Sequence, residues 1–514
     1  MTAKSQPDDR DDLFRPEVPV DWDGLRRVFK EADYCLDTLT DVAQASRPQT
    51  GWSVTLALHR MDASPRLQTL ARLFLFGLET TRAEAEAALG AALTAQLLAA
   101  RVLLPSGGNG LRAEGAILAY QDNLIAHDFS PLLTLQEPGR DHVLGVGEAT
   151  MMLDSITPRL PVRRALDVGT GSGYQALLAA RHASAVVGTD VNPRALAFAR
   201  LSLRMNGIRT VELREGSFFD PAGAEPYDLI VSNPPFVISP ERLYVYRDSE
   251  LQGNRMAEFM IRESAARLDE GGFAAILLSW THETADDWAR LLPSWVRDTG
   301  CDALQLKFST LSPPDYTATW LADTHRRDPR EAERKIGEWL AHFQALGVRN
   351  ISWGGVILRK RAAGRKWTRS HVVSQDSSTG PRGDQVLRIF RNVDLLENLT
   401  DDAALLEIPL VLAPEHALVY SMEAERGPDG LGGGWKLLRA RLHLTRGLAF
   451  ASNTDSNAAS VLAACDGKRP LRAVVEEFAK KTGAPASALA PSVVAALKPL
   501  LEGGFIMPGS ARPS

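Results

Sequence analysis

The chain has few cysteines, no long apolar stretch and little excess charge, and each absence excludes a class of protein. Its three cysteines, Cys35, Cys301 and Cys465, are too far apart for a zinc motif or a disulfide framework, so we expect reduced thiols and no metal site. No apolar run reaches the roughly 18 residues of a membrane-spanning helix. Residues 1–12 are polar and lack the apolar region of a signal peptide, so we expect a cytoplasmic location. The formal net charge of −5 argues against a general polyanion binder.

The length and composition favour several globular domains. A chain of 514 residues exceeds one typical domain, and a hydrophobic content of 45% is sufficient for proper cores. We expect three domains, at residues 1–135, 136–365 and 366–514.

A glycine-rich turn in the central region follows an apolar strand. Residues 164–169 read as a short buried strand, then come Thr170-Gly171-Ser172-Gly173 and a helical run over 174–182. Glycines in this position let the backbone approach a ligand at a helix N-terminus. A second strand, 185–189, ends in Asp190, about 20 residues past the turn, where an acidic side chain can bind ribose hydroxyls. Asn192-Pro193 then opens another helix.

The same glycines also fit a nicotinamide or flavin enzyme, because residues 171–176 satisfy the G-x-G-x-x-G/A pattern. Two features argue for a different cofactor. Asp167 stands inside the preceding strand, where it is placed to hold a cationic ligand, and a second motif ends a later strand.

That second motif is Asn233-Pro234-Pro235-Phe236, after the apolar run 227–232. The Asn amide oxygen and a backbone carbonyl that precedes proline give two hydrogen-bond acceptors, and Phe236 adds a flat apolar wall. Such a site suits a planar NH2 group, whose nitrogen becomes more reactive when acceptors hold its hydrogens. A structural loop is the alternative interpretation, because Asn-Pro commonly starts turns.

Together, residues 167–173 and 233–236 resemble class I S-adenosylmethionine methyltransferases. More narrowly, they resemble the HemK-like and "methyltransferase small domain" group, which modifies glutamine amides or base amines. The resemblance covers roughly residues 140–360. It implies S-adenosyl-L-methionine as cofactor and no metal.

The resemblance also assigns roles to individual residues. Asn233 would orient the target, with Pro234, Pro235 and Phe236 completing the catalytic motif. Related enzymes often have an acidic residue where Ser217 stands, so the adenine contact departs from the pattern, and Phe218 has a core position as its alternative. The residues implied at the cofactor are Asp167, Gly169 and Gly171 at its amino-acid end, Thr170 and Gly173 in the loop, Asp190 at the ribose, Ser217 and Phe218 beside the adenine, and also Asn192 and Asn233.

The remaining periodicity predicts an α/β fold with a doubly wound, mostly parallel, Rossmann-like sheet. In this topology the glycine-loop strand and the Asn233 strand lie side by side at the switch point. The further strands are expected at 210–214, 272–279, 301–309 and 351–358, and the helices at 193–206, 256–268 and 329–346.

Three segments near the catalytic region have open interpretations. Residues 244–248 are a polar aromatic loop that either covers the target or only connects elements. Residues 359–369 hold six cations and Trp367, which suits phosphates and a stacked base, or alternatively a solvated domain exit. Residues 141–157 either close over the cofactor or form a plain linker.

The flanking regions read as accessory domains. Helices at 66–77, 81–89 and 93–101, with Thr80 or Thr81 as N-cap, and strands over 102–126 predict an N-terminal winged-helix-like unit. Residues 374–383 look like a linker and 427–434 like a hairpin loop. Helices at 460–464, 471–482 and 488–502 with the strand 505–507 resemble PqqD-like winged-helix modules within a C-terminal α+β accessory domain.

We therefore expect an N-methyltransferase that acts on a macromolecule. A glutamine side chain in a protein, such as a translation factor, is the preferred substrate. An exocyclic base amine in rRNA, tRNA or DNA is the alternative, and a non-catalytic cofactor-binding module is a third. No membrane partner is expected, and the sequence does not indicate an oligomeric state.

Overall fold

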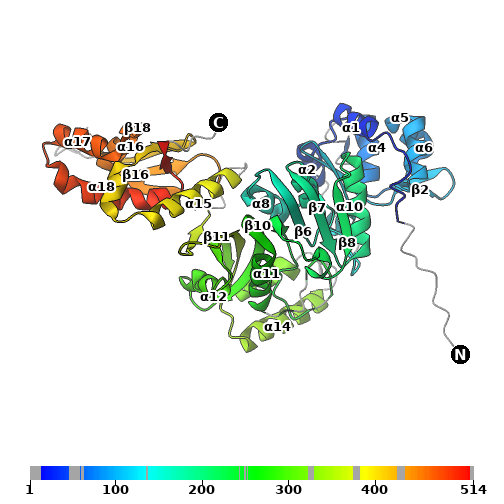
Figure 1. The fold of residues 1–514 in the computed structure, drawn as a ribbon. Helices are drawn as coiled ribbons and strands as arrows, with labels where there is room; N and C mark the ends of the chain where they lie inside the picture. Colours follow the sequence, from blue (N-terminus) through cyan, green and yellow to red (C-terminus); the bar gives the residue numbers. More distant parts are fainter. Residues whose placement is uncertain are drawn as a thin grey trace.

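The computed structural model describes residues 13–45, 58–59, 63–134, 137–241, 243–247, 251, 253–321, 329–373, 382–424 and 434–509. A central α/β domain has the N-terminal region on one side and the C-terminal region on the other (Figure 1). Within these ranges, no helix is long and apolar enough to span a bilayer.

The N-terminal region is mainly helical. A capping box fixes the start of α5: the Thr81 hydroxyl accepts a hydrogen bond from the Glu84 amide, and the Thr81 amide donates to the Glu84 carboxylate. Of the two expected N-caps, Thr81 is therefore the correct one. The elements are α1 (Trp22–Glu31), α2 (Leu36–Ala45), α4 (Pro65–Phe74), β1 (Thr80–Thr81), α5 (Arg82–Leu89), α6 (Ala91–Ala99), β2 (Leu103–Ser106) and β3 (Gly110–Ala113), and the strands pair in the order β1-β3-β2.

Residues 116–127 do not complete this sheet, contrary to expectation. They form a separate hairpin of β4 (Ala116–Tyr120) and β5 (Asn123–His127). Side chains of α10 (Pro193–Met205) hold the hairpin, because the Ala126 amide donates to Ser202 and Asn206 bonds both backbone groups of Leu124. The hairpin thus joins the N-terminal region to the central domain, and the winged-helix assignment stays a prediction.

The central sheet is mostly parallel, as expected. Eight strands follow the order β13-β11-β12-β10-β9-β6-β7-β8, and only β12 runs antiparallel to its neighbours. The strands are β6 (Val162–Val168), β7 (Ala183–Asp190), β8 (Val211–Glu215), β9 (Tyr227–Ser232), β10 (Leu268–His282), β11 (Cys301–Leu311), β12 (Asn350–Lys360) and β13 (Thr368–Val372).

Strand β13 corrects one domain boundary. It pairs in parallel with β11, so residues 368–372 belong to the central sheet and the boundary expected at 366 is too early. The signal was missed because the tract's charges obscured a short strand whose side chains are half-buried.

Helices cover both faces of the sheet. One face packs against α8 (Glu148–Ile156), α9 (Tyr174–Ala179) and α15 (Gly383–Asn398), and the other against α11 (Arg255–Arg267) and α12 (Leu292–Trp295). Between β11 and β12 the chain inserts α13 (Pro313–Leu321) and α14 (Pro329–Ala345). Their aromatic side chains form a separate core with Val237 and Ile238, directly after the 233–236 motif. Short helices complete the central domain: α7 (Pro131–Thr134), η2 (Asp220–Ala222) and η3 (Asp287–Ala289).

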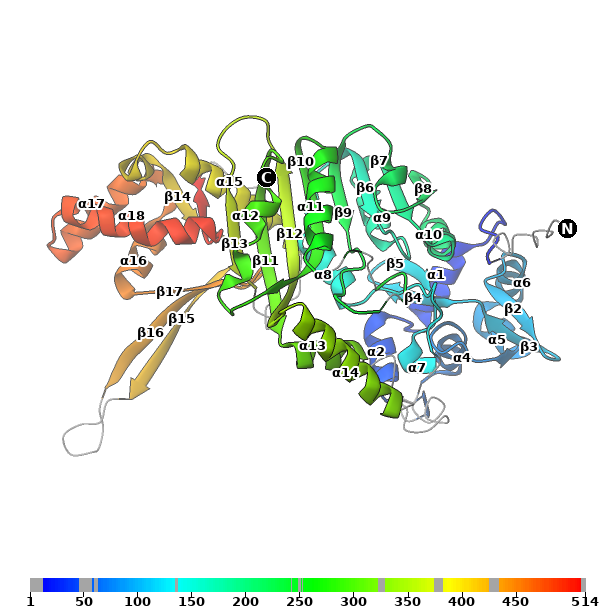
Figure 2. The same cartoon turned by 90° about the horizontal axis from the view of Figure 1, so that it is seen from below.

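The C-terminal region combines small sheets with helices. Strands β15 and β16 form a long hairpin that projects from the rest of the region (Figure 2). Most of the expected linker and the tip of this hairpin lie outside the described residues, and the PqqD-like assignment stays a prediction. The elements after α15 are η4 (Asp402–Glu407), β14 (Pro409–Leu412), β15 (His416–Ala424), β16 (Trp435–Leu444), β17 (Ala451–Thr454), α16 (Ser456–Ala464), β18 (Asp466–Pro470), α17 (Leu471–Thr482), α18 (Ala486–Glu502) and β19 (Ile506–Pro508).

Candidate functional site

A cavity of about 1400 Å³ opens at the carboxyl ends of the central strands. Strands β6 and β9 are adjacent and parallel, with Val168 opposite Ser232, so the glycine loop and the 233–236 motif emerge side by side. The Ser232 hydroxyl donates to the Val168 carbonyl at 2.8 Å and fixes this pairing. The expected switch-point arrangement is confirmed.

The glycine loop leaves open space on the cavity side. Gly169 and Gly171 have φ angles of +73° and +55°, and a Cβ built at Gly169 would meet no atom within 4 Å. Gly173 serves a different purpose, because its Cβ would lie 3.0 Å from Ala199 on α10. The first two glycines therefore shape the cradle, and Gly173 permits close helix packing.

Asp167 and Thr170 form the floor of this loop. The Thr170 hydroxyl and the Ala176 amide both donate to one Asp167 oxygen, at 2.7 and 2.9 Å. Asp167 also lines the cavity, although only 2% of its surface is exposed. Burial raises its pKa to about 7, against the lowering effect of these two hydrogen bonds. A cation in the cavity would favour the ionised form.

Asp190 and Asn192 line the neighbouring part of the cavity. The Asp190 carboxylate accepts from the amides of Gly171 and Asn192, both at 2.9 Å, so it ties the glycine loop to the end of β7. Burial raises its pKa, and these amide hydrogen bonds oppose the shift. Asn192 caps α10 by accepting from the Arg194 amide, and its own amide donates to the Asp141 carbonyl.

Ser217 and Phe218 border the cavity beyond β8. Phe218 has a φ of +45°, and its carbonyl accepts from the Thr189 hydroxyl at 2.8 Å. Its half-buried ring packs edge-on against Phe259, with centroids 5.4 Å apart. Phe218 thus combines the two expected positions, since it borders both the cavity and the core.

The 233–236 motif presents a polar atom without a partner. Oδ1 of Asn233 is shielded from solvent and accepts no hydrogen bond from any described residue. Asn233, Pro235 and Phe236 line the cavity, and Pro234 is buried beneath them. A buried acceptor without a donor is costly, and ligand binding is one way to satisfy it.

The segment after the motif is held by buried charges rather than left as a free loop. Glu241 pairs with Arg247 and with Lys335 of α14, each at 2.7 Å. The Ile238 amide donates to the Tyr316 hydroxyl on α13 at 3.0 Å. Val245 and Tyr246 line the cavity, in agreement with the covering role, while Asp248 lies outside the described residues.

Residues 142–150 line the cavity, and they belong to the segment 141–157 for which closure over the cofactor was one of two expectations. The Arg140 carbonyl accepts from the Val245 amide, so the segment before β6 meets the loop after β9. Other lining residues were not identified from the sequence. Ser279, Tyr316 and Ser352 come from β10, α13 and β12. No local motif marks them, because each is brought in by the sheet order or by the inserted helices.

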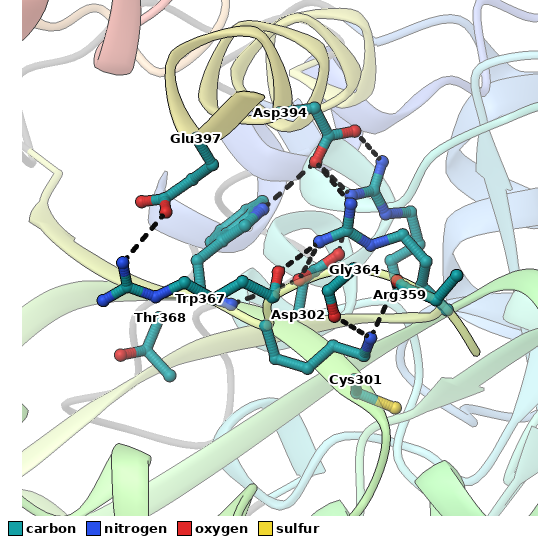
Figure 3. Close-up of polar contacts among 12 residues, drawn as sticks. Cys301, Asp302, Arg359, Gly364, Trp367, Thr368, Asp394 and Glu397 are labelled. Carbon is teal, nitrogen blue, oxygen red and sulfur yellow. Dashed lines mark hydrogen bonds and ion pairs between the residues drawn. The ribbon is translucent and has the colours of Figure 1, made fainter. Parts of the chain in front are cut away.

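The basic tract 359–369 is largely a structural junction (Figure 3). Arg359 contacts Asp302 and Asp394 at 2.6 Å, and Arg361 contacts Asp302 at 3.0 Å. Trp367 is buried and donates its backbone and indole N–H groups to the same two carboxylates. This arrangement argues against a phosphate surface made from the whole tract.

The other cations of the tract are also mostly engaged. Arg369 pairs with Glu397 and Glu502, and Lys360 donates to two backbone carbonyls. Arg365 has a side chain that is 86% exposed. The solvated-exit interpretation therefore holds for only a small part of the tract.

Residues 145–285 match a family model described as "Methyltransferase small domain". The matched segment runs from before β6 to just past the end of β10 and contains both the glycine loop and the 233–236 motif. Two further models match the flanking regions, DUF7059 at residues 32–114 and DUF7782 at residues 388–508, and both are described as domains of unknown function.

Curated methyltransferases are similar to parts of the chain. A release factor glutamine methyltransferase of Aliivibrio fischeri is 34% identical over 111 residues, which cover 21% of this chain and 37% of the relative. A ribosomal protein uL3 glutamine methyltransferase of Bradyrhizobium diazoefficiens is 40% identical, with coverage of 19% and 30%. A tRNA1(Val) (adenine(37)-N6)-methyltransferase of Aeromonas salmonicida is 37% identical, with coverage of 18% and 40%. The chain spans less than half of the length of each of these relatives.

Among solved structures, a methyltransferase from Pyrococcus furiosus is 17% identical, with a TM-score of 0.25 and coverage of 40% of this chain and 77% of that one.

Proposed function

We propose that this chain is an S-adenosylmethionine-dependent methyltransferase that methylates a planar nitrogen of a macromolecule. The side-chain amide of a protein glutamine is the preferred acceptor. The observation that carries the proposal is the unpartnered Oδ1 of Asn233, which lines the same cavity as the glycine loop.

The residues around the cavity fit the proposed cofactor. Gly169 and Gly171 leave room for a ligand against the backbone, and Asp190 can accept hydrogen bonds from ribose hydroxyls beyond those it receives from backbone amides. Asp167 places a buried carboxyl group where it would face a positive charge. When bound, S-adenosylmethionine supplies a methyl group activated by its sulfonium centre.

The protein's part in the reaction is to position and polarise the acceptor. The Asn233 amide oxygen would accept a hydrogen bond from the target NH2, which favours a pyramidal nitrogen whose lone pair is available. Phe236 would hold the planar group by stacking. Transfer is an in-line displacement that needs no covalent intermediate with the protein, so orientation contributes much of the rate.

The substrate preference rests on the relatives. Two of those described above are named as glutamine methyltransferases of a release factor and of ribosomal protein uL3, which supports a protein of the translation machinery as partner. The flanking domains would contact such a large substrate, and a cytoplasmic location is part of the same proposal.

Methylation of an exocyclic base amine is the alternative. It is supported by the relative named as a tRNA adenine methyltransferase and by the equal fit of the 233–236 motif to an aromatic amine. A module that binds the cofactor without turnover is the third candidate.

One labelling experiment separates the three functions. Purified protein is incubated with tritiated S-adenosylmethionine and an extract of cells that do not express the protein. The labelled products are then separated into protease-sensitive and nuclease-sensitive fractions. Label in a protein band, mapped to a glutamine by mass spectrometry, is the expected result. Label in RNA or DNA would favour the base amine, and tight cofactor binding without any label would favour the non-catalytic module.

A further inference from the structure

Three cavity-lining side chains in the described part of the chain carry a buried polar atom without a hydrogen-bond partner. They are Nε2 of His142, Oδ1 of Asn233 and Oγ of Ser279. Buried polar atoms in proteins are nearly always paired, so unpaired atoms that share one cavity point to a ligand that completes them. Asn233 already has an assigned role, and Ser279 has none.

Ser279 is close to Asn233 through the sheet register. Strand β10 is parallel to β9, with Ile276 opposite Ser232, so Ser279 lies two residues further along the neighbouring strand than Asn233. That offset is ~7 Å along the strand direction. A carboxamide group with a hydrogen bond of about 2.9 Å at each end can bridge such a separation.

The hydroxyl O–H of Ser279 is a hydrogen-bond donor without an acceptor among the described residues. The Tyr316 hydroxyl accepts from the Ile238 amide, so its own proton is left to donate to Ser279, and a hydrogen bond with Ser279 lowers the pKa of Tyr316 against the larger raising effect of burial. Ser279 is 4% exposed and lines the cavity. A ligand oxygen in the cavity would satisfy its O–H donor.

We infer that Ser279 is the second contact to the target group: its hydroxyl donates to the carbonyl oxygen of the substrate carboxamide while Asn233 Oδ1 accepts from the NH2. This inference rests on the proposed methylation of a planar nitrogen and specifies how the target is recognised. The pair of contacts selects an NH2 group whose adjacent carbon carries an acceptor. It disfavours an alkyl ammonium group, which has no acceptor for the Ser279 proton.

The role is one of binding and orientation. Loss of the hydroxyl should therefore raise KM for the substrate more than it lowers kcat, and should leave affinity for the cofactor unchanged. It should also leave the fold intact, because the Ser279 O–H donates no hydrogen bond to a described residue in the free protein.

Small probes test the inference on the full chain saturated with S-adenosylhomocysteine, so that no turnover occurs. The probes are N-acetylglutamine methylamide, the matched glutamate γ-methyl ester, which keeps the carbonyl but lacks the NH2, and N-acetyllysine methylamide. Binding is followed by saturation-transfer NMR titration. The variants are Ser279→Ala, Asn233→Ala and the control Ser264→Ala, which removes another buried, unpartnered hydroxyl that lies on α11 outside the cavity lining.

We expect the unaltered protein to prefer the glutamine probe to the lysine probe. Ser279→Ala should weaken binding of the glutamine probe and of the ester probe, which both have a side-chain carbonyl, by about tenfold. Asn233→Ala should weaken binding of the glutamine probe alone, and Ser264→Ala should weaken binding of neither. The melting temperature of Ser279→Ala should equal that of the unaltered protein.

Three outcomes would overturn the inference. The first is unchanged binding by Ser279→Ala, and the second is a loss of binding that accompanies a lower melting temperature of that variant. The third is no preference of the unaltered protein for the glutamine probe. Failure of the proposed methyl transfer would look different, because the probes would bind with the expected pattern while the labelling experiment gave no methylated product.

Discussion

The cavity and the basic tract both contain the residue types of a binding site, but their polar groups have different partners. At the cavity, Asn233 and Ser279 each have a buried polar atom without a partner among the described residues. In the tract, the carboxylates of Asp302 and Asp394 pair with Arg359 and Trp367, and Nε of Arg359 and of Arg361 has no partner in the described part of the chain. Unpaired atoms that share one cavity point to a ligand, whereas carboxylates that neutralise buried cations mark a junction within the fold.

Removing a carboxylate from the junction should lower the free energy of unfolding more than any other change considered below. Asp302 is fully buried and holds Arg359, Arg361 and the Trp367 amide. Asp302→Ala leaves cations buried without their partner, so we expect the free energy of unfolding to fall by about 3–5 kcal/mol in a denaturant titration.

The matched control for the junction is a surface ion pair. Asp269 contacts Arg163, whose side chain is 76% exposed. Asp269→Ala should cost at most about 1 kcal/mol. Equal losses for the two variants would mean that the tract is not a buried junction.

Removing the unsatisfied acceptor should affect chemistry and not the fold. Asn233→Ala should lower the rate of methyl transfer by about 100-fold or more, because one preorganised acceptor at the reacting nitrogen is lost. The melting temperature and the dissociation constant for S-adenosylhomocysteine should stay within experimental error. Assays with the acceptor identified by labelling measure the first effect, and calorimetry the other two. Turnover at the unaltered rate would remove Asn233 from the mechanism.

The sequence predicted the parts of the site that are local in the chain. The glycine loop and the 233–236 motif each lie at the end of one apolar strand, and the adjacency of β6 and β9 follows from the general rules of a parallel α/β sheet. Phe218 was expected either at the cavity or in the core. It borders both, because it lines the cavity and its ring packs against Phe259.

The remaining parts depend on contacts between distant segments. Ser279 lines the cavity because β10 lies beside β9. Tyr316 lines it because two helices are inserted late in the chain, and Tyr316 contacts Ile238 across a separation of 78 residues. The tract was misinterpreted for the same reason. Its carboxylate partners, Asp302 and Asp394, lie 57 and 35 residues from Arg359, so no local pattern reveals that its charge is paired.

The buried carboxyl group of Asp167 should make cofactor affinity depend on pH. Its pKa is raised to about 7, so the free protein binds a proton there below pH 7, and the α-ammonium group at the amino-acid end of the cofactor favours the deprotonated form. Binding then releases a proton, and affinity for S-adenosylmethionine should rise with pH from 6 to 7 and level off above 8. The gain is limited to about tenfold per pH unit.

Two controls isolate this effect by isothermal titration calorimetry. S-adenosylhomocysteine lacks the sulfonium charge but keeps the α-ammonium group, so its profile should have the same slope over this range. Asp167→Asn removes the titrating group and should flatten both profiles. A steep profile for both ligands in that variant would assign the pH dependence to another group.

The smallest effect is expected at the turn of the tract that holds Arg365 and Lys366. Arg365 is mostly exposed and lies 3.9 Å from Glu397, and Lys366 donates to the carbonyls of Ala363 and Gly364. The double change Arg365→Ala with Lys366→Ala should alter the free energy of unfolding by no more than about 0.5 kcal/mol. On a protein acceptor, methyl transfer should change less than about twofold, because the junction that stabilises the domain stays intact. If transfer instead falls by tenfold or more, and the loss depends on salt concentration, these two cations contact a nucleic acid, and the base-amine alternative gains the surface that the rest of the tract does not provide.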